Sequence, residues 1–151
     1  MDFQIRKMNI NDRDEVMGMM KEFYSSDAVS TNGSNEIFDT DIKTCINGSP
    51  YLEGYIFHNN NEIFGYAMIA KSFSTEFGRP CIWLEDLYLK SKYRGNGIVS
   101  EFLNYIKQIY SNSIFKLEVE KENTHAIHVY KKSNFKELPY TEMLAVNVTK
   151  K

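Results

Sequence analysis

The chain has 151 residues, 42% of them hydrophobic and 25% charged, and its formal net charge at pH 7 is −2. The length is typical of one domain, and this hydrophobic content excludes an intrinsically disordered chain. Because 18 Lys and Arg residues face 20 Asp and Glu residues, no overall positive field exists, which disfavours a nucleic-acid-binding protein. We therefore expect a single domain over residues 1–151, with no nucleic-acid partner.

Signals of secretion or membrane insertion are not evident. Residues 1–6 lack a basic segment followed by an apolar run, so no signal peptide is predicted. No stretch approaches the ~20 consecutive apolar residues that cross a bilayer. Cys45 and Cys81 lie far apart without CxxC spacing, which favours two buried thiols in a reducing compartment. We expect a soluble, cytoplasmic protein with no membrane partner.

The N-terminal third predicts one strand and two helices. A short strand over residues 4–8 precedes a helix that begins at Asn11, since an Asn cap followed by acidic residues suits a helix N-terminus. Apolar residues at helical spacing extend this helix to about Tyr24. After a polar loop over residues 25–35, a second helix is predicted over residues 36–47, and Gly48 supplies its left-handed C-terminal residue.

The middle of the chain predicts strands. Residues 55–57 and 62–70 form a hairpin around an Asn-rich turn. A polar connection over residues 72–80 leads to a further strand over residues 81–89. A basic, glycine-containing turn follows at residues 90–97.

The C-terminal part alternates helices and strands. An amphipathic helix begins at Ile98 and includes Ile109. Residues 114–120 alternate as a strand with Glu118 and Glu120 outward, a short helix covers residues 124–133, and residues 135–138 and 143–148 are predicted strands. This element order predicts a mixed α/β fold, in which one sheet carries helices on both faces.

The segment from Trp83 to Val99 is the most informative in chemical terms. A strand runs into a glycine-containing turn and then into a helix, so free amides at the helix N-terminus can hold a phosphate or pyrophosphate. Three residues add positive charge there: Lys90, Lys92 and Arg94. A plain tight turn is the alternative. Ser100 departs from the dinucleotide pattern GxGxxG, and Ile98 after Gly97 departs from the nucleotide-triphosphate loop.

Two motifs resemble those of the GNAT N-acetyltransferases. Residues 84–89 and 93–98 resemble the family's acetyl-CoA-binding motif, Gln/Arg-x-x-Gly-x-Gly/Ala: Arg94 and Gly97 match, and Val99 departs from the final small residue. Residues 123–135 resemble the family's Asn…Ala…Tyr-x-Lys-x-Gly-Phe, with Asn134 in place of Gly. The resemblance covers nearly the whole chain and implies the GNAT fold, with six to seven mostly antiparallel strands. Glu85–Asp86 most resembles the diamine and polyamine acetyltransferase branch.

The resemblance implies direct transfer of an acetyl group from acetyl-CoA to a primary amine. It implies that the amide of Leu87, at a strand bulge, stabilises the oxyanion, and that main-chain groups of the strand pair with the pantetheine arm. Amides of the glycine-containing turn would hold the pyrophosphate. Asn123 would contact the coenzyme, or else cap the helix that follows. The implied cofactor-binding residues are Leu87, Tyr88, Leu89, Arg94, Gly95, Asn96, Gly97, Ile98, Val99, Ser100 and Asn123.

Two residues are candidates for proton transfer. Tyr130 matches the family's tyrosine and, because a phenol is neutral at pH 7, can protonate the departing thiolate; the alternative is a core aromatic residue. Glu85 matches the acidic strand position of the polyamine branch and can act as a base through water or anchor a cationic substrate. Asp86 is the adjacent alternative, and alternation places the two on opposite faces unless a bulge intervenes.

Metal chemistry is not expected. His125 and His128 are three residues apart and no third ligand with suitable spacing follows, so exposed helix residues are predicted. The acceptor is expected to be a small-molecule amine such as a polyamine or an amino-acid-like compound. Two alternatives remain: acetylation of a protein N-terminus or lysine, and a non-catalytic CoA-binding regulatory module, which the departures at Val99 and Asn134 would suit. A homodimer is expected from the resemblance.

Overall fold

A computed structural model describes residues 2–147 and contains one five-stranded sheet in the order β1-β2-β3-β4-β5. The three pairs β1–β2, β2–β3 and β3–β4 are antiparallel, and β5 pairs parallel with β4. No helix among these residues is both long and apolar enough to cross a membrane. The strands are β1 (Gln4–Lys7), β2 (Leu52–His58), β3 (Ile63–Ser74), β4 (Arg79–Leu89) and β5 (Ile114–Leu117), and the helices are α1 (Arg13–Tyr24), α2 (Asn35–Ile46), α3 (Ile98–Ile109) and α4 (Thr124–Lys132).

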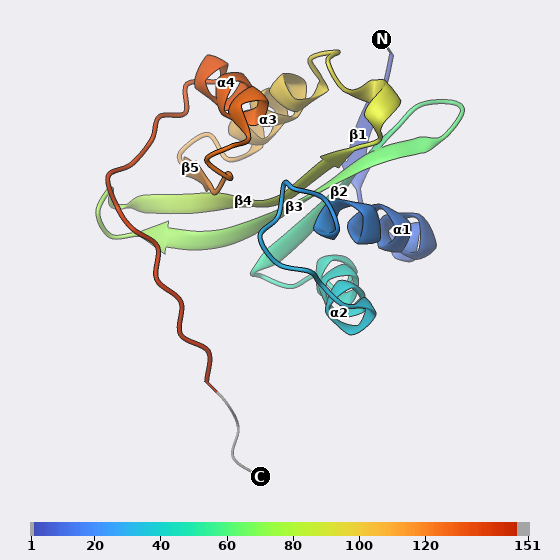
Figure 1. Cartoon of the computed structure of the whole chain (residues 1–151), viewed down its shortest axis with the longest axis horizontal. Coiled ribbons are helices and arrows are strands. Elements are labelled where there is room, and N and C mark those ends of the chain that lie inside the picture. The colour runs from blue at the N-terminus through green and yellow to red at the C-terminus, as the bar shows by residue number, and fades with distance from the viewer. Residues whose placement is uncertain (1, 148–151) are drawn as a thin grey trace.

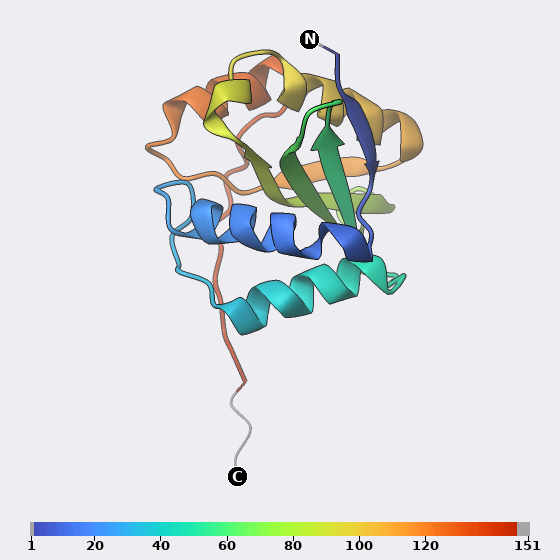
Figure 2. The same cartoon turned by 90° about the vertical axis from the view of Figure 1, so that its right-hand side faces the viewer.

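Helices cover both faces of the sheet, as predicted. Helices α1 and α2 lie side by side on one face, and α3 and α4 lie on the other (Figures 1 and 2). Each face therefore has its own hydrophobic core. The core under α1 and α2 contains Val16, Met20, Ile42, Ile56 and Tyr66, and the core under α3 and α4 contains Tyr55, Phe57, Phe64, Phe102 and Ile106.

Helix ends follow the local chemistry of the sequence, with one shift. A 3-10 turn, Ile10–Asp12, precedes α1 and is capped by Asn9 rather than Asn11, because the carboxylate of Asp12 in turn accepts the backbone N–H of Asn9. Ser34 caps α2. Gly48 adopts a φ of 72° beyond the end of α2, which confirms the predicted left-handed residue.

The central strands are longer than predicted and β5 is shorter. Strand β3 continues to Ser74 and β4 starts at Arg79, so the predicted polar connection over residues 72–80 is a tight hairpin turn. Ten cross-strand residue pairs hold the two strands together, and this pairing outweighs the low strand propensity of the polar side chains. Strand β5 ends at Leu117, so Glu118 and Glu120 lie beyond the strand.

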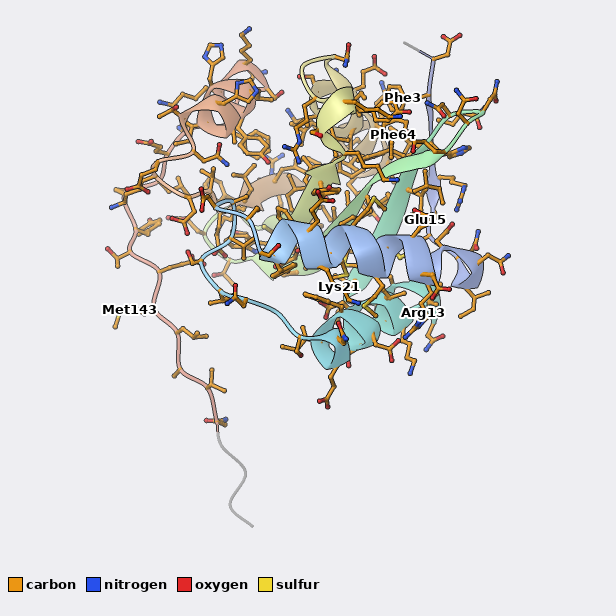
Figure 3. All side chains as sticks on the ribbon, turned by 45° about the vertical axis from the view of Figure 1, so that its right-hand side comes forward. Phe3, Arg13, Glu15, Lys21, Phe64 and Met143 are labelled. Carbon is orange, nitrogen blue, oxygen red and sulfur yellow. The ribbon has the colours of Figure 1, made fainter. Side chains whose placement is uncertain are left out.

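The prediction of two C-terminal strands was wrong, and the sheet has five strands rather than six to seven. Residues 135–138 and 143–147 are not strands, and Val148 lies outside the described residues. Strand propensity alone does not form a strand, because its backbone groups need a partner. The segment after α4 instead runs across the end of the β3–β4 hairpin and away from the body, so that Met143 points into solvent (Figures 1 and 3).

Candidate active site

The edge of β4 that faces β5 is only partly paired. Parallel pairing between the two strands covers only Cys81–Leu84 of β4. Directly after it, Glu85 is an extra residue: Leu84 pairs with Ile69 of β3, and Asp86 pairs with Met68. From Glu85 to Leu89, the outer edge of β4 therefore has no strand partner among residues 2–147. An extended ligand such as a pantetheine arm can pair with these backbone groups.

The bulge lies two residues earlier than expected. Leu87, predicted at the bulge, is in regular register opposite Ala67. The extra residue shifts the alternation by one position, so Asp86 and Tyr88 face the core under α1 and α2, whereas Leu84 and Leu89 face the other core.

The turn between β4 and α3 has the geometry of an anion site. Gly95 and Gly97 have φ values of 80° and 76°, and a Cβ on either would meet open space. Gly97 caps α3 without a side-chain hydrogen bond, and the first backbone bond of the helix runs from Glu101 N–H to Gly97 O. Backbone N–H groups of residues 95–100 have no acceptor among the described residues, so they can bind a diphosphate.

The basic residues of this turn contribute less free charge than predicted. Lys92 pairs with Glu62 at 2.7 Å, and Lys90 lies 3.5 Å from Glu62 and 3.8 Å from Glu15. Arg94 donates from Nε to the carbonyl of Leu89 (2.9 Å). It has no carboxylate partner within residues 2–147. The free amides are therefore the principal candidates for binding an anion.

Tyr130 lies on α4 and packs against the core under α3 and α4, against which Leu87 also packs. Its ring packs edge-on against Phe135, with centroids 5.9 Å apart. Burial raises the pKa of Tyr130 to about 12, so the phenol stays protonated at neutral pH. Its hydroxyl has no protein acceptor among the described residues. The ring is thus a packing element, as the alternative predicted, and the hydroxyl is a proton donor without an internal partner.

The second motif builds α4 locally. The Asn123 side chain accepts the backbone N–H of Ala126 at 3.2 Å, which confirms the capping alternative. Asn134 has a φ of 71°, so it occupies the left-handed conformation for which the family uses glycine. The departure from the motif at Asn134 therefore preserves the backbone path.

On the other face, Asp86 is held by two tyrosines. Tyr24 of α1 donates to Oδ1 and Tyr66 of β3 donates to Oδ2, both at 2.8 Å. Burial raises the pKa of Asp86, and the two hydroxyls oppose that rise. Asp86 has no cationic partner within the described residues. A buried carboxylate with hydrogen bonds but no counter-charge is suited to a cation that arrives from outside.

Further carboxylates lie close to Asp86. Burial, followed by repulsion from Asp86 and Glu85, raises the pKa of Asp41 to about 6. Burial, then repulsion from Asp86 and Glu142, raises the pKa of Glu85. A hydrogen bond with Glu142, together with burial, raises the pKa of Glu118 to about 7. These shifts indicate a concentration of negative charge around Glu85 and Asp86.

Sequence reasoning missed Tyr24, Tyr66 and Asp41. The two tyrosines are 62 and 20 residues from Asp86 in the chain, so no local spacing links them to it. A signal existed for Asp41: it lies three residues after Phe38 and one before Ile42, both buried, and thus places a carboxylate on the inner face of α2.

The two candidate metal-binding histidines, His125 and His128, are exposed on α4, as predicted. Within residues 2–147, no three His, Cys, Asp or Glu side chains come together as metal ligands would.

Known proteins share this architecture. Thialysine N-epsilon-acetyltransferase from Sus scrofa is 35% identical over 81 residues, a match that covers 52% of this chain and 47% of that protein, so the chain matches about half the length of this relative. A possible acetyltransferase from Clostridium difficile 630 has a TM-score of 0.81 at 20% identity, covering 97% of this chain and 99% of that one. AAC(6')-Iy in complex with a bisubstrate analog, CoA-S-monomethyl-acetylneamine, has a TM-score of 0.78 at 14% identity, covering 98% and 100%.

These likenesses agree with the order of the elements and with the topology of the sheet. The acetyltransferase (GNAT) family matches residues 16–135, which is most of the chain. The chain therefore belongs to the GNAT acetyltransferase family.

Proposed function

We propose that the protein transfers the acetyl group of acetyl-CoA to a primary amine of a small cationic molecule, polyamine-like or amino-acid-like. The observation that carries this proposal is the set of carboxylates Asp41, Glu85 and Asp86, which have no cationic partner among residues 2–147. Two of them lie on the segment of β4 that has no β5 partner. An ammonium group would supply the missing positive charge.

The residues proposed for the site can perform the proton transfers. An alkylammonium has a pKa near ~10.4, so the amine must first lose a proton, which Glu85 can accept through water. The nitrogen lone pair then forms a bond to the thioester carbonyl carbon, the attacking nitrogen releases its second proton to solvent, and the Leu87 amide can stabilise the oxyanion. As the carbon–sulfur bond breaks, Tyr130 can protonate the leaving thiolate and regain its proton from solvent. No metal ion is needed for this sequence.

Two observations favour a small acceptor over a protein. The hydroxyl of Ser30, in the α1–α2 loop, donates to Glu120, in the β5–α4 loop, so the two loops meet across the acceptor side. The matched relatives named for thialysine and for an acetylneamine analog are named for small amines. An exposed lysine side chain on a folded protein would need a wider approach.

The departures from the family motif do not favour a non-catalytic module. The side chain of Val99 packs into the core under α3 rather than into the phosphate turn. Asn134 retains the left-handed backbone. Both positions therefore leave the coenzyme site open.

Thiol release from acetyl-CoA, measured over a panel of amines, tests the proposal. We expect turnover with small diamines or basic amino acids and little with a neutral monoamine or a lysine-containing folded protein. Turnover confined to protein substrates, or none with any amine, would contradict it. Calorimetric titration separates the coenzyme assignment from the acceptor assignment, because tighter binding of NADH or ATP than of acetyl-CoA would overturn the first alone.

Tyr130→Phe distinguishes an enzyme from a binding module. The variant keeps the ring packed against Phe135 and removes only the proton donor. We expect turnover to fall about 100-fold or more, the usual effect of losing a general acid, with unchanged acetyl-CoA affinity. A wild-type protein that binds acetyl-CoA but has no turnover to lose would establish the module instead.

We also propose a homodimer, in a reducing, cytoplasmic compartment. Residues 136–147 form no backbone hydrogen bond within the described chain, and Met143, Leu144 and Val146 are 93%, 88% and 73% exposed. A second copy could cover this strand-prone segment and remove an aggregation hazard. Light scattering should give a dimer mass, and Leu144→Asp should give a monomer. Two free thiols, Cys45 and Cys81, agree with a reducing compartment.

A further inference from the structure

The β2–β3 hairpin carries a hydrogen-bonded cluster that contacts the start of the phosphate turn. At its centre is the carboxylate of Glu62, which accepts the hydroxyl of Tyr93 at 2.7 Å and pairs with Lys92 at 2.7 Å. Hydrogen bonds from Lys92 and Tyr93 lower the pKa of Glu62 to about 2, so the carboxylate is charged at any pH of interest. Glu62 and Lys92 lie outside the two motif segments, whereas Tyr93 is the first residue of segment 93–98.

Tyr93 is fixed on every side. Its ring stacks on Phe64 of β3 with centroids 4.0 Å apart and planes within 16°, and only 7% of the residue is exposed. Phe64 lies in turn against Phe3 of the N-terminal segment (Figure 3). Asn59 of the hairpin turn donates a further hydrogen bond to the Tyr93 hydroxyl, at 3.1 Å. The Tyr93 hydroxyl therefore has a defined donor, Asn59, and a defined acceptor, Glu62, and the ring has a defined position.

The backbone of Tyr93 connects this cluster with the anion-binding amides. The carbonyl of Tyr93 accepts a hydrogen bond from the side chain of Asn96, at 3.1 Å. Asn96 lies between Gly95 and Gly97, whose positive φ values are conformations that glycine adopts without strain. A displacement of Tyr93 would be transmitted to the amides at residues 95–97. Preorganised amides bind an anion without a cost in ordering.

We propose that Glu62 and Tyr93 are positioning residues for the coenzyme: through Asn96, they hold the phosphate turn in its binding conformation. The inference rests on the proposed function, since it assumes that the turn binds the diphosphate of acetyl-CoA. The β2–β3 hairpin thereby becomes part of the coenzyme site, although it does not touch the coenzyme.

Tyr93→Phe is the cleanest variant. It retains the ring on Phe64 and removes only the hydroxyl. We expect the Kd and KM for acetyl-CoA to rise about 3- to 10-fold, the equivalent of one hydrogen bond, while kcat and the acceptor KM stay unchanged. Glu62→Ala should have an equal or larger effect. Glu62→Gln retains an acceptor for the Tyr93 hydroxyl and frees Lys92, so its KM for acetyl-CoA should remain at or below the wild-type value.

Tyr110→Phe is the matched control. Tyr110 also donates its hydroxyl to a glutamate, Glu53, in a part of the sheet remote from the turn. This variant should lose thermal stability without any change in acetyl-CoA affinity. If Tyr93→Phe and Glu62→Ala bind acetyl-CoA as the wild type does, or lose kcat in proportion to stability at constant KM, the positioning role is refuted. A wild-type protein that fails to bind acetyl-CoA would refute the proposed function instead.

Discussion

Two buried carboxylates on the same sheet, Glu53 and Asp86, have contrasting environments. Each accepts two tyrosine hydroxyls: Tyr55 and Tyr110 donate to Glu53, whereas Tyr24 and Tyr66 donate to Asp86. Glu53 also pairs with Lys71 at 2.8 Å and Lys7 at 3.0 Å. Asp86 has no such cation within residues 2–147.

The pKa shifts of the two carboxyls have opposite signs. Burial tends to raise the pKa of Glu53, but hydrogen bonds from Lys71, Tyr110 and Tyr55 outweigh it and lower the pKa to about 2. At Asp86 burial prevails and the pKa is raised. A carboxylate whose charge is compensated within the chain stabilises the fold, whereas a buried one without a counter-charge is suited to a cationic ligand. The comparison assigns Glu53 to structure and supports the proposal that Asp86 binds the acceptor.

For these two carboxylates, the largest expected effect is on the acceptor kinetics of Asp86→Asn. This change removes the charge and retains the shape. We expect kcat/KM for a cationic amine to fall about 10- to 100-fold, which corresponds to a lost charge-assisted contact, with the Kd for acetyl-CoA unchanged. Stability at pH 7 should change by no more than about 1 kcal/mol, because no internal ion pair is broken. Unchanged amine kinetics would remove Asp86 from the acceptor site.

The next effect in size concerns acid stability and Glu53. Because its folded pKa is depressed, Glu53 contributes stability that is fully present above its unfolded pKa of about 4.5 and is lost as the pH falls through about 2. The shift corresponds to roughly 3 kcal/mol at neutral pH. Denaturant unfolding between pH 7 and pH 2 measures the loss.

Glu53→Gln is the control for that measurement. The variant should be less stable than the wild type at pH 7 and should converge with it near pH 2, while its acceptor and coenzyme kinetics stay unchanged. Curves that remain parallel over the whole range would show that Glu53 is not the titrating group.

The same contrast explains what the sequence could predict. The geometry of the proposed coenzyme side was predictable, because its residues lie within short segments whose spacing is itself the signal: Gly95 and Gly97 in the turn, and Asn123 and Asn134 at the ends of α4. The proposed acceptor side was not predictable, because Tyr24, Tyr66 and Asp86 meet only after three elements pack. The bulge at Glu85 also shifts the alternation of side chains along β4 by one residue. A simple alternation therefore assigns the residues beyond Glu85 to the wrong face of the sheet.

The C-terminal strands failed for a related reason. Residues 143–147 have strand-forming composition, and β-propensity is in practice a preference for a paired, half-buried surface. No strand of the described chain pairs with these residues, so they do not form a strand there. Helices α1, α3 and α4 were predicted with small boundary errors because their hydrogen bonds are internal.

The smallest expected effect is that of Tyr24→Phe on the pH dependence of kcat/KM. It is also the most specific test of the role of Asp86. The Tyr24 hydroxyl lowers the pKa of Asp86, so its removal raises that pKa further. If the charged form of Asp86 binds the amine, the acid limb of kcat/KM must move to higher pH. One hydrogen bond of about 1 kcal/mol corresponds to roughly 0.7 of a pH unit. Tyr55→Phe, which removes a donor from Glu53 instead, should leave the profile in place. A profile that moves equally in both variants would mean that the two carboxylates do not differ as the comparison requires.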